Sequence, residues 1–532
     1  MTPLRILFQM IKADYLERVR RYSFLITVLV SIFIVYKCIP SSHESYITLS
    51  FHNIRGIYNS DWVGSATAIL ASMILSLPAF FLVKNAIERD VQTGVGQIIA
   101  TTPITKWMYT MGKMWSNFVF LMSIVAVLMV SALVMQLIRG ESYTVELLEL
   151  LLPFLYSTLP TIALVASIAI FFESVPLFRK GLGNLIYFVL WILSLRLSTT
   201  ATHSSQDILG ISPILTRLSS GVNARLPHSN GGHISGVSPL RGDLVTYDWT
   251  GVPWTMQMFL ERYIWLAVAV GIAVVASIFF HRFDLTRSSN ISTNGKPREF
   301  RNVEPQMKPV PINDSGIKLT PYTNVVHGQS HYIRILGMEL RLMLKGLRIW
   351  WYLIALVMIV LGLLLPMESV TRFVAPFTWV WPILIWSAMG TNETYHRTHQ
   401  FVFTAMHPVR NQFIVLWLAG IIVAYLAGSG AMIHCLVAGE WETLMAMAVG
   451  GLFIPTLALA LGVWSRNSKL FQVIFMLMWY LGPLNKLTVM DFMGASQQSL
   501  DQGIYLYYLL ATAVLLMLAV VGRLRQVRIT TY

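Results

Sequence analysis

The chain has 532 residues, of which 55% are hydrophobic and 12% charged, and its formal net charge is +14. Soluble domains carry roughly 25% charged residues, so the composition excludes an ordinary soluble protein. Two cysteines, Cys38 and Cys435, exclude a disulfide framework and a multi-cysteine metal site. Apolar stretches long enough to cross a hydrocarbon core recur along the chain and predict an all-α polytopic membrane protein.

Twelve membrane spans are predicted. They cover residues 22–40, 62–83, 114–138, 150–172, 184–200, 256–280, 349–366, 374–391, 413–437, 445–464, 471–487 and 503–522. With the amino terminus in the cytoplasm, the cytoplasmic segments hold 29 of the 39 Lys and Arg residues. Basic residues gather on the cytoplasmic side of membrane proteins, so both termini are expected there. This distribution also explains the high charge without a nucleic-acid partner.

Two polar stretches divide the chain. Residues 200–254 form an outer segment rich in Ser, Gly, His and Asp, which we expect to fold as a lid over the outer mouth. Residues 284–330 read as a flexible cytoplasmic linker because they are rich in Pro, Asn and charge. The predicted organisation is a first six-span half at 1–283, the linker at 284–330, and a second six-span half at 331–532.

The two halves resemble each other. An amphipathic segment precedes each one, "LRILFQMIKADYLERVRRYSFLI" in the first half and "IRILGMELRLMLKGLRIWWYLI" in the second. Such helices are expected to lie in the membrane interface, with their apolar face towards lipid. A positive flank that only orients the first span is the alternative for either helix taken alone, but its repetition favours an interfacial element.

A polar stretch also follows the second span of each half, at Glu88–Trp107 ("ERDVQTGVGQIIATTPITKW") and Glu393–Gln412 ("ETYHRTHQFVFTAMHPVRNQ"). Each stretch is longer than a simple chain reversal requires. We expect a helix–turn–helix in each, with Pro103 and Pro408 starting a short helix and Thr102 capping the first of these.

The segment "E…TG…IIATTPITKWMYTMGK" resembles the first cytoplasmic loop of ABC-2-type ABC transporter permeases. In that family an acidic residue, a glycine, a proline-started short helix and a basic residue follow the second helix. The order of an interfacial helix, six spans and a longer outer segment before the sixth span also matches, over nearly the whole chain. The second half lacks the glycine and the lysine.

The resemblance implies a type V-like ABC exporter fold, in which twelve helices form two six-helix repeats as a pseudo-dimer. It implies a permease subunit in a prokaryotic cell membrane, with an amphipathic or hydrophobic substrate exported by alternating access. Separate ABC ATPase subunits, as two copies, would bind ATP and Mg²⁺. By resemblance, the residues that couple the two halves to these ATPases are Glu88, Gly94, Pro103, Lys113, Glu393 and Pro408.

The chain itself carries no G-x-x-x-x-G-K-[ST] phosphate-binding loop, so no cofactor and no enzymatic activity of its own are predicted. His396 and His399, with His407 nearby, lack the further ligands that a metal site needs. Ionisable residues such as Arg196, Glu261, Arg262 and Lys486 lie near the outer ends of spans, where they can reach the interface. The absence of a mid-span charge argues for energy supplied from outside the membrane.

Polar and aromatic side chains on the second and fifth spans of the halves are candidates for a substrate path. These are Ser65, Ser72, Ser76, Trp379, Trp386, Trp479, Tyr480 and Asn485. Ordinary helix packing is an equally good explanation for them. Two other functions stay open: a twelve-helix secondary transporter built from two repeats, and an intramembrane enzyme with residues 200–254 as its catalytic face.

Overall fold

The computed structural model describes residues 3–20, 22–41, 46–50, 54–179, 181–201, 206–223, 235–239, 245–280, 330–345, 347, 349–396, 398–403 and 412–531. The chain forms two compact units, Met1–Gly295 and Lys296–Tyr532. The linker predicted at 284–330 lies outside the described residues, except for Ser330.

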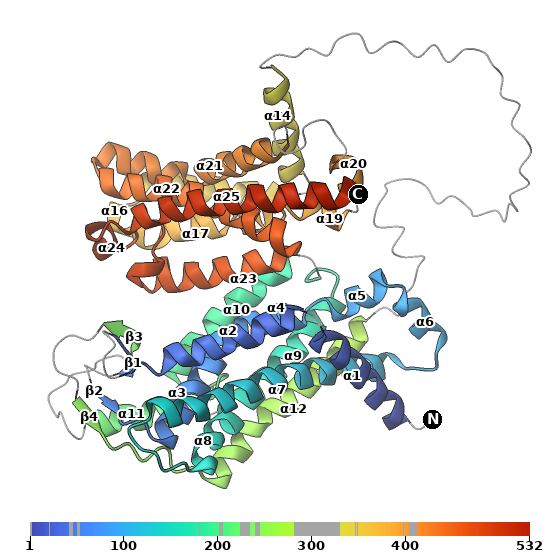
Figure 1. Cartoon of the computed structure of the whole chain (residues 1–532), viewed down its shortest axis with the longest axis vertical. Helices are drawn as coiled ribbons and strands as arrows, with labels where there is room; N and C mark the ends of the chain where they lie inside the picture. The colour runs from blue at the N-terminus through green and yellow to red at the C-terminus, as the bar shows by residue number, and fades with distance from the viewer. Residues whose placement is uncertain are drawn as a thin grey trace, which may run out of the picture. The chain divides into compact units, whose positions relative to one another are not determined.

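The first unit is a helical bundle with short strands at one end (Figure 1). Its helices and π-helical turns are α1 (Pro3–Val19), α2 (Tyr22–Cys38), α3 (Ser60–Leu70), η1 (Ala71–Leu75), α4 (Ser76–Val83), α5 (Ala86–Gln92), α6 (Val95–Thr101), α7 (Lys106–Arg139), α8 (Leu147–Pro153), η2 (Phe154–Thr158), α9 (Leu159–Ser174), α10 (Gly181–Thr200), α11 (Ser212–Asn223) and α12 (Met256–Phe279). The helix α9 lies against α12, α7 and α4 and forms the centre of the bundle.

The second unit is also helical. Its elements are α14 (Ser330–Leu344), α15 (Ile349–Leu364), α16 (Met367–Ser369), η3 (Val370–Val374), α17 (Ala375–Val380), α18 (Ile383–Trp386), α19 (Asn392–Tyr395), α20 (His399–Phe403), α21 (Ile414–Ala438), α22 (Trp441–Ser465), α23 (Ser468–Trp479), η5 (Tyr480–Leu484), η6 (Thr488–Met490), α24 (Gln497–Asp501) and α25 (Ile504–Thr531). Here α22 is central and packs on α25, α21 and α23.

Among the described residues, eight helices are long and apolar enough to cross a membrane, and ten if two bent pairs count as spans. The protein is therefore an all-α polytopic membrane protein, as predicted from composition. The predicted spans at 374–391 and 471–487 are not among the ten. The first is divided into α17 and α18 at Pro382, and the second is a shorter apolar helix, Ser468–Leu484. A count of twelve stays a prediction.

Prolines account for the four π-helical turns η1, η2, η3 and η5. Pro78, Pro160 and Pro376 follow η1, η2 and η3 within three residues, and Pro483 lies inside η5. Proline removes an N–H and its ring crowds the carbonyl four residues earlier, so the preceding turn widens. One such turn, η1, lies within the predicted second span of the first unit, and η3 lies at the start of the predicted second span of the second unit.

Short strands join the loop after α2 to the outer segment 200–254 of the first unit. Strand β1 (Tyr46–Ser50) pairs antiparallel with β3 (Ser235–Pro239), and Tyr46 lies opposite Pro239. Strand β2 (Ile54–Gly56) pairs parallel with β4 (Val245–Tyr247). The predicted outer segment 200–254 is thus partly folded against the loop after α2, at the end of the bundle opposite α5 and α6 (Figure 1).

A bidentate ion pair fixes strand β2 to the connection between α7 and α8. The guanidinium of Arg55 donates to both carboxylate oxygens of Glu141, at 2.9 and 2.7 Å, and the Tyr58 N–H donates to the same carboxylate. Burial alone would raise the pKa of Glu141, but the hydrogen bonds from Arg55 and Tyr58 outweigh it and lower that pKa. The charged form of Glu141 therefore holds β2 against the connection between α7 and α8.

Candidate functional site

Two short helices, α5 and α6, follow the second span of the first unit, where the sequence predicts a polar helix–turn–helix. Gly94 separates them with a φ of +77°, a conformation that glycine adopts without steric cost. The predicted start of the second helix at Pro103 is wrong: α6 ends at Thr101, and Pro103 lies in the link to α7. The next helix is capped by Thr105, whose hydroxyl accepts from the Met108 N–H, so Thr102 is not its cap.

The carboxylate of Glu173, at the end of α9, caps the start of α5. It accepts hydrogen bonds from the backbone N–H groups of Asn85, Ala86, Ile87 and Glu88, at 2.6 to 3.4 Å. These N–H groups have no partner inside their own helix, and the helix dipole also favours an anion there. Glu173 is 1% exposed, so the central helix of the unit directly holds the short helix. The candidate Glu88 itself is half-buried and accepts from Gln92.

Lys113 of α7, a candidate coupling residue, is buried and 1% exposed. Its ammonium lies 2.9 Å from a carboxylate oxygen of Asp14 on α1 and 2.8 Å from one of Asp90 on α5. The Tyr109 hydroxyl also donates to Asp90, at 2.6 Å. One cation therefore joins three helices, α1, α5 and α7.

In the second unit, α19 and α20 occupy the corresponding place in the chain. Glu393 of α19 is buried and forms an ion pair with Arg523 of α25. The Arg523 guanidinium also donates to Gln526, whose amide donates to the Val463 carbonyl at the end of α22. Residues 404–411, with the candidate Pro408, lie outside the described residues.

Both short-helix elements expose apolar side chains although they are fastened by buried charges. Val91 and Ile98, on α5 and α6, are 58% and 67% exposed. Tyr395 and Phe401, in the second unit, are 67% and 81% exposed. Exposed apolar side chains on a rigid support are typical of surfaces that bind a protein or enter a membrane interface.

The predicted path residues of the first unit are packed among its helices. Ser65, Ser72 and Ser76 are each at most 2% exposed. Ser72 shares a 2.6 Å hydrogen bond with Ser157 of η2, and the Trp191 indole N–H donates to the Ser76 hydroxyl at 3.0 Å. Within this unit Ser72 and Ser76 join the second span to η2 and α10.

The tryptophans predicted for the path lie in the interior of the second unit. All three are at most 1% exposed: Trp379, Trp386 and Trp479. The indole N–H of Trp386 donates to the Gly420 carbonyl, and the indole N–H of Trp479 donates to the Pro376 carbonyl. Tyr480 is half-buried and Asn485 is exposed; they are joined by an amide-to-carbonyl hydrogen bond of 2.6 Å. A role of these residues in transport stays a prediction.

Sequence reasoning missed a motif that occurs once in each unit. The segments "DILGIS" at 207–212 and "DFMGAS" at 491–496 share the pattern D-x-x-G-x-S after the fifth predicted span. In each, the aspartate accepts from the backbone N–H of the final serine, at 2.7 and 2.8 Å. Gly210 and Gly494 have φ values of +71° and +70°. A search for short identical patterns at matched positions would have found this signal.

Arg262 is another residue whose role was missed. The sequence predicts that Arg262 reaches the membrane interface, but its side chain is 0% exposed and lies inside the unit. Its guanidinium donates to the carbonyls of Tyr156, Asp207 and Ile208. The first unit thus ties the D-x-x-G-x-S turn to α12. In the second unit the Tyr508 hydroxyl of α25 donates to the Val489 carbonyl in η6, just before the corresponding turn.

Among the described residues, no group of three or more His, Cys, Asp or Glu side chains is placed to hold a metal ion. Comparisons with protein families, curated protein sequences and solved structures found no match to this chain.

Proposed function

We propose that this chain is the transmembrane permease subunit of an ABC exporter, built as two fused ABC-2-type half-permeases. The observation that carries the proposal is repeated in both units. After the second predicted span of each unit, a pair of short helices exposes apolar side chains and is held to its own bundle by buried charged groups. These groups are Glu173 and Lys113 in the first unit and the Glu393–Arg523 pair in the second. Such an element suits a soluble partner that pushes on a membrane bundle.

In this proposal, ATPase subunits with bound ATP and Mg²⁺ close together and move α5–α6 and α19–α20. Glu173 and Lys113 pass the movement to α9, α7 and α1, and Glu393 passes it to α25. Driving a two-state transporter almost fully from one state to the other requires a difference of about 5.5 kcal/mol. The cargo would be amphipathic or hydrophobic, and the chain would lie in a prokaryotic cell membrane with both termini in the cytoplasm.

The test is co-purification of the chain with the ATPase encoded beside its gene, followed by vanadate-sensitive ATP hydrolysis in liposomes. Ile98→Asp places a charge among the exposed apolar side chains of α5 and α6 and should weaken ATPase binding by roughly tenfold or more. Tyr143→Asp is the matched control, because Tyr143 is 72% exposed in the connection between α7 and α8, at the other end of the bundle. Glu88→Ala and Glu393→Ala test the acidic residues of the resemblance.

The results also separate the other two functions. A secondary transporter would carry its cargo without the ATPase and would stop when ion gradients are dissipated. An intramembrane enzyme would show turnover without transport. Full ATPase binding by Ile98→Asp, with loss of binding by Tyr143→Asp, would contradict the assignment of the docking surface.

A further inference from the structure

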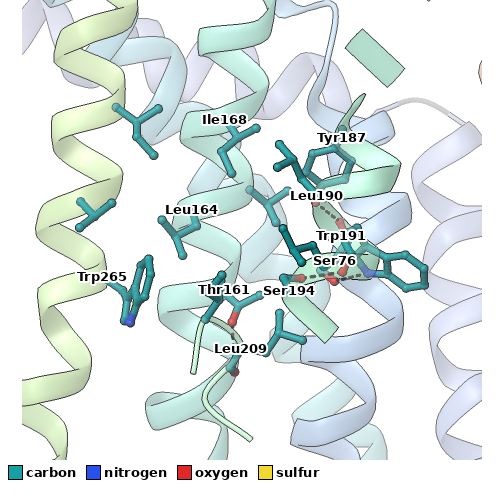
Figure 2. A pocket seen from close by; sticks show the side chains of 15 residues that line it. Ser76, Thr161, Leu164, Ile168, Tyr187, Leu190, Trp191, Ser194, Leu209 and Trp265 are labelled. Carbon is teal, nitrogen blue, oxygen red and sulfur yellow. Dashed lines mark hydrogen bonds between the residues drawn. The ribbon is translucent and has the colours of Figure 1, made fainter. Parts of the chain in front are cut away.

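The first unit contains a cavity of about 210 Å³ among α9, α10, α12 and the D-x-x-G-x-S turn. Figure 2 shows Leu164 and Ile168 of α9 at its back, Trp265 of α12 on one side, and Leu190 of α10 on the other. Leu209 of the turn forms its floor. Protein interiors hold few voids larger than a water molecule, so a space of this size calls for an occupant.

The polar side chains that α4, α9 and α10 contribute to the lining are hydrogen-bonded within the unit. The Tyr187 hydroxyl donates to the Ser76 carbonyl, and the Trp191 indole N–H donates to the Ser76 hydroxyl and the Met73 carbonyl. The hydroxyls of Thr161 and Ser194 donate to helix carbonyls. An apolar cavity of about 150 Å³ stays dry and takes up benzene, so this larger one selects a hydrocarbon group.

The cavity reaches the outside of the bundle between α10 and α12. Three lining residues at this edge, Leu190, Leu193 and Val268, are 43%, 51% and 39% exposed. They lie in the middle of two predicted spans, at the depth where lipid tails rather than headgroups surround a membrane helix. In the described part of the chain, α10 packs on α4 and α11, whereas α12 packs on α9 and α7. The helices α10 and α12 do not pack closely on each other there.

The second unit fills the matching place with its own side chains. Phe492 occupies the motif position of Ile208 and is 0% exposed. Its ring lies 5.8 to 6.4 Å from the rings of Trp379, Phe453 and Phe475. The same turn is therefore closed by aromatic packing in one unit and borders an open cavity in the other.

We propose that this cavity binds one acyl chain of a membrane phospholipid, which enters between α10 and α12. The chain end would contact Trp265, Ile168 and Leu190, while the headgroup stays at the membrane surface. The inference does not depend on transport, because it needs only a bilayer around α10 and α12.

The experiment uses the full chain in phosphatidylcholine vesicles that contain a small fraction of phosphatidylcholine with a diazirine near the end of one acyl chain. After illumination, adducts are mapped by mass spectrometry. We expect adducts in 161–168, 187–194 and 265–272 that saturate as the probe fraction rises, whereas adducts on the lipid-exposed α25 rise in proportion to the probe. A probe with the diazirine on its headgroup should not label the cavity.

Ile168→Phe fills the cavity from its back and should abolish the saturable adducts, with labelling of α25 unchanged. Leu190→Phe narrows the entrance without changing α9 and should have the same effect. Ile264→Phe is the control, since Ile264 is 62% exposed on α12 and does not line the cavity. Proportional labelling of the cavity segments, or saturable labelling that survives Ile168→Phe and Leu190→Phe, would overturn the proposal.

Discussion

Replacing Lys113 by Met should strongly destabilise the first unit. The Lys113 side chain is 2% exposed, and those of its partners Asp14 and Asp90 are 12% and 8% exposed. Methionine matches the length of lysine but leaves two buried carboxylates without their cation. Asp90 keeps the Tyr109 hydroxyl, whereas Asp14 loses both of its hydrogen bonds to Lys113. Removing one partner of a buried ion pair costs roughly 3–5 kcal/mol.

Thermal unfolding of the purified chain in detergent, followed by tryptophan fluorescence, measures this loss. At roughly 2–4 °C per kcal/mol, the expected decrease in Tm is about 6–20 °C. Lys106→Met is the matched control, because Lys106 is an exposed lysine at the start of the same helix. The reasoning also requires that Asp14→Asn relieves part of the defect in a double variant with Lys113→Met. Equal Tm values for Lys113→Met and Lys106→Met would refute it.

Three further predictions follow from buried polar contacts. Glu173→Gln leaves one oxygen for four N–H groups and should destabilise α5 by roughly 1–3 kcal/mol, seen as faster amide exchange at its start and not in α12. The lowered pKa of Glu141 means that its pair with Arg55 stabilises the outer strands above the unfolded-state pKa and is lost as the pH falls through the folded-state value. The protection of the β2 amides against exchange, relative to the intrinsic rate at each pH, should therefore fall in the wild type once the pH drops below the ordinary Glu pKa of about 4.3, and Glu141→Gln should show the lower protection already at pH 7. Gly494→Ala should cost more than the roughly 1–2 kcal/mol of a left-handed conformation, because its Cβ would lie 2.7 Å from the side chains of Ala446 and Leu500; an unchanged Tm would contradict this.

The membrane helices and the two polar pairs of short helices were predictable because their signals are local. An apolar stretch of sufficient length has few alternatives to a span, and a polar stretch between two spans must lie outside the hydrocarbon. The position of α6 was not predicted, because a proline was assumed to start a helix. Gly94 is the residue at which the short helices separate, and Pro103 only separates α6 from α7.

The polar contacts at the candidate site could not be predicted because they join residues far apart in the chain. Lys113 was predicted only as a residue of the loop motif that couples to the ATPase, and its partner Asp14 lies 99 positions before it in the chain. Arg262 was expected to reach the membrane interface. The carbonyls to which it donates belong instead to η2, which precedes α9, and to the D-x-x-G-x-S turn. In a membrane interior, a charged side chain that finds enough partners is stabilised without reaching water.

The D-x-x-G-x-S turn bears most directly on how the two units are related. In both units the aspartate accepts from the N–H of the serine five positions on, and the glycine three positions on has a positive φ. The second N–H that the aspartate caps differs, being that of Gly210 in the first unit and of Ala495 in the second. The packing around the turn has diverged, since Ile208 borders a cavity and Phe492 is enclosed by aromatic rings. If the units arose by duplication, the backbone of the turn was retained while its surroundings changed. A difference between the units in lipid binding would then be expected even where they share one mechanism.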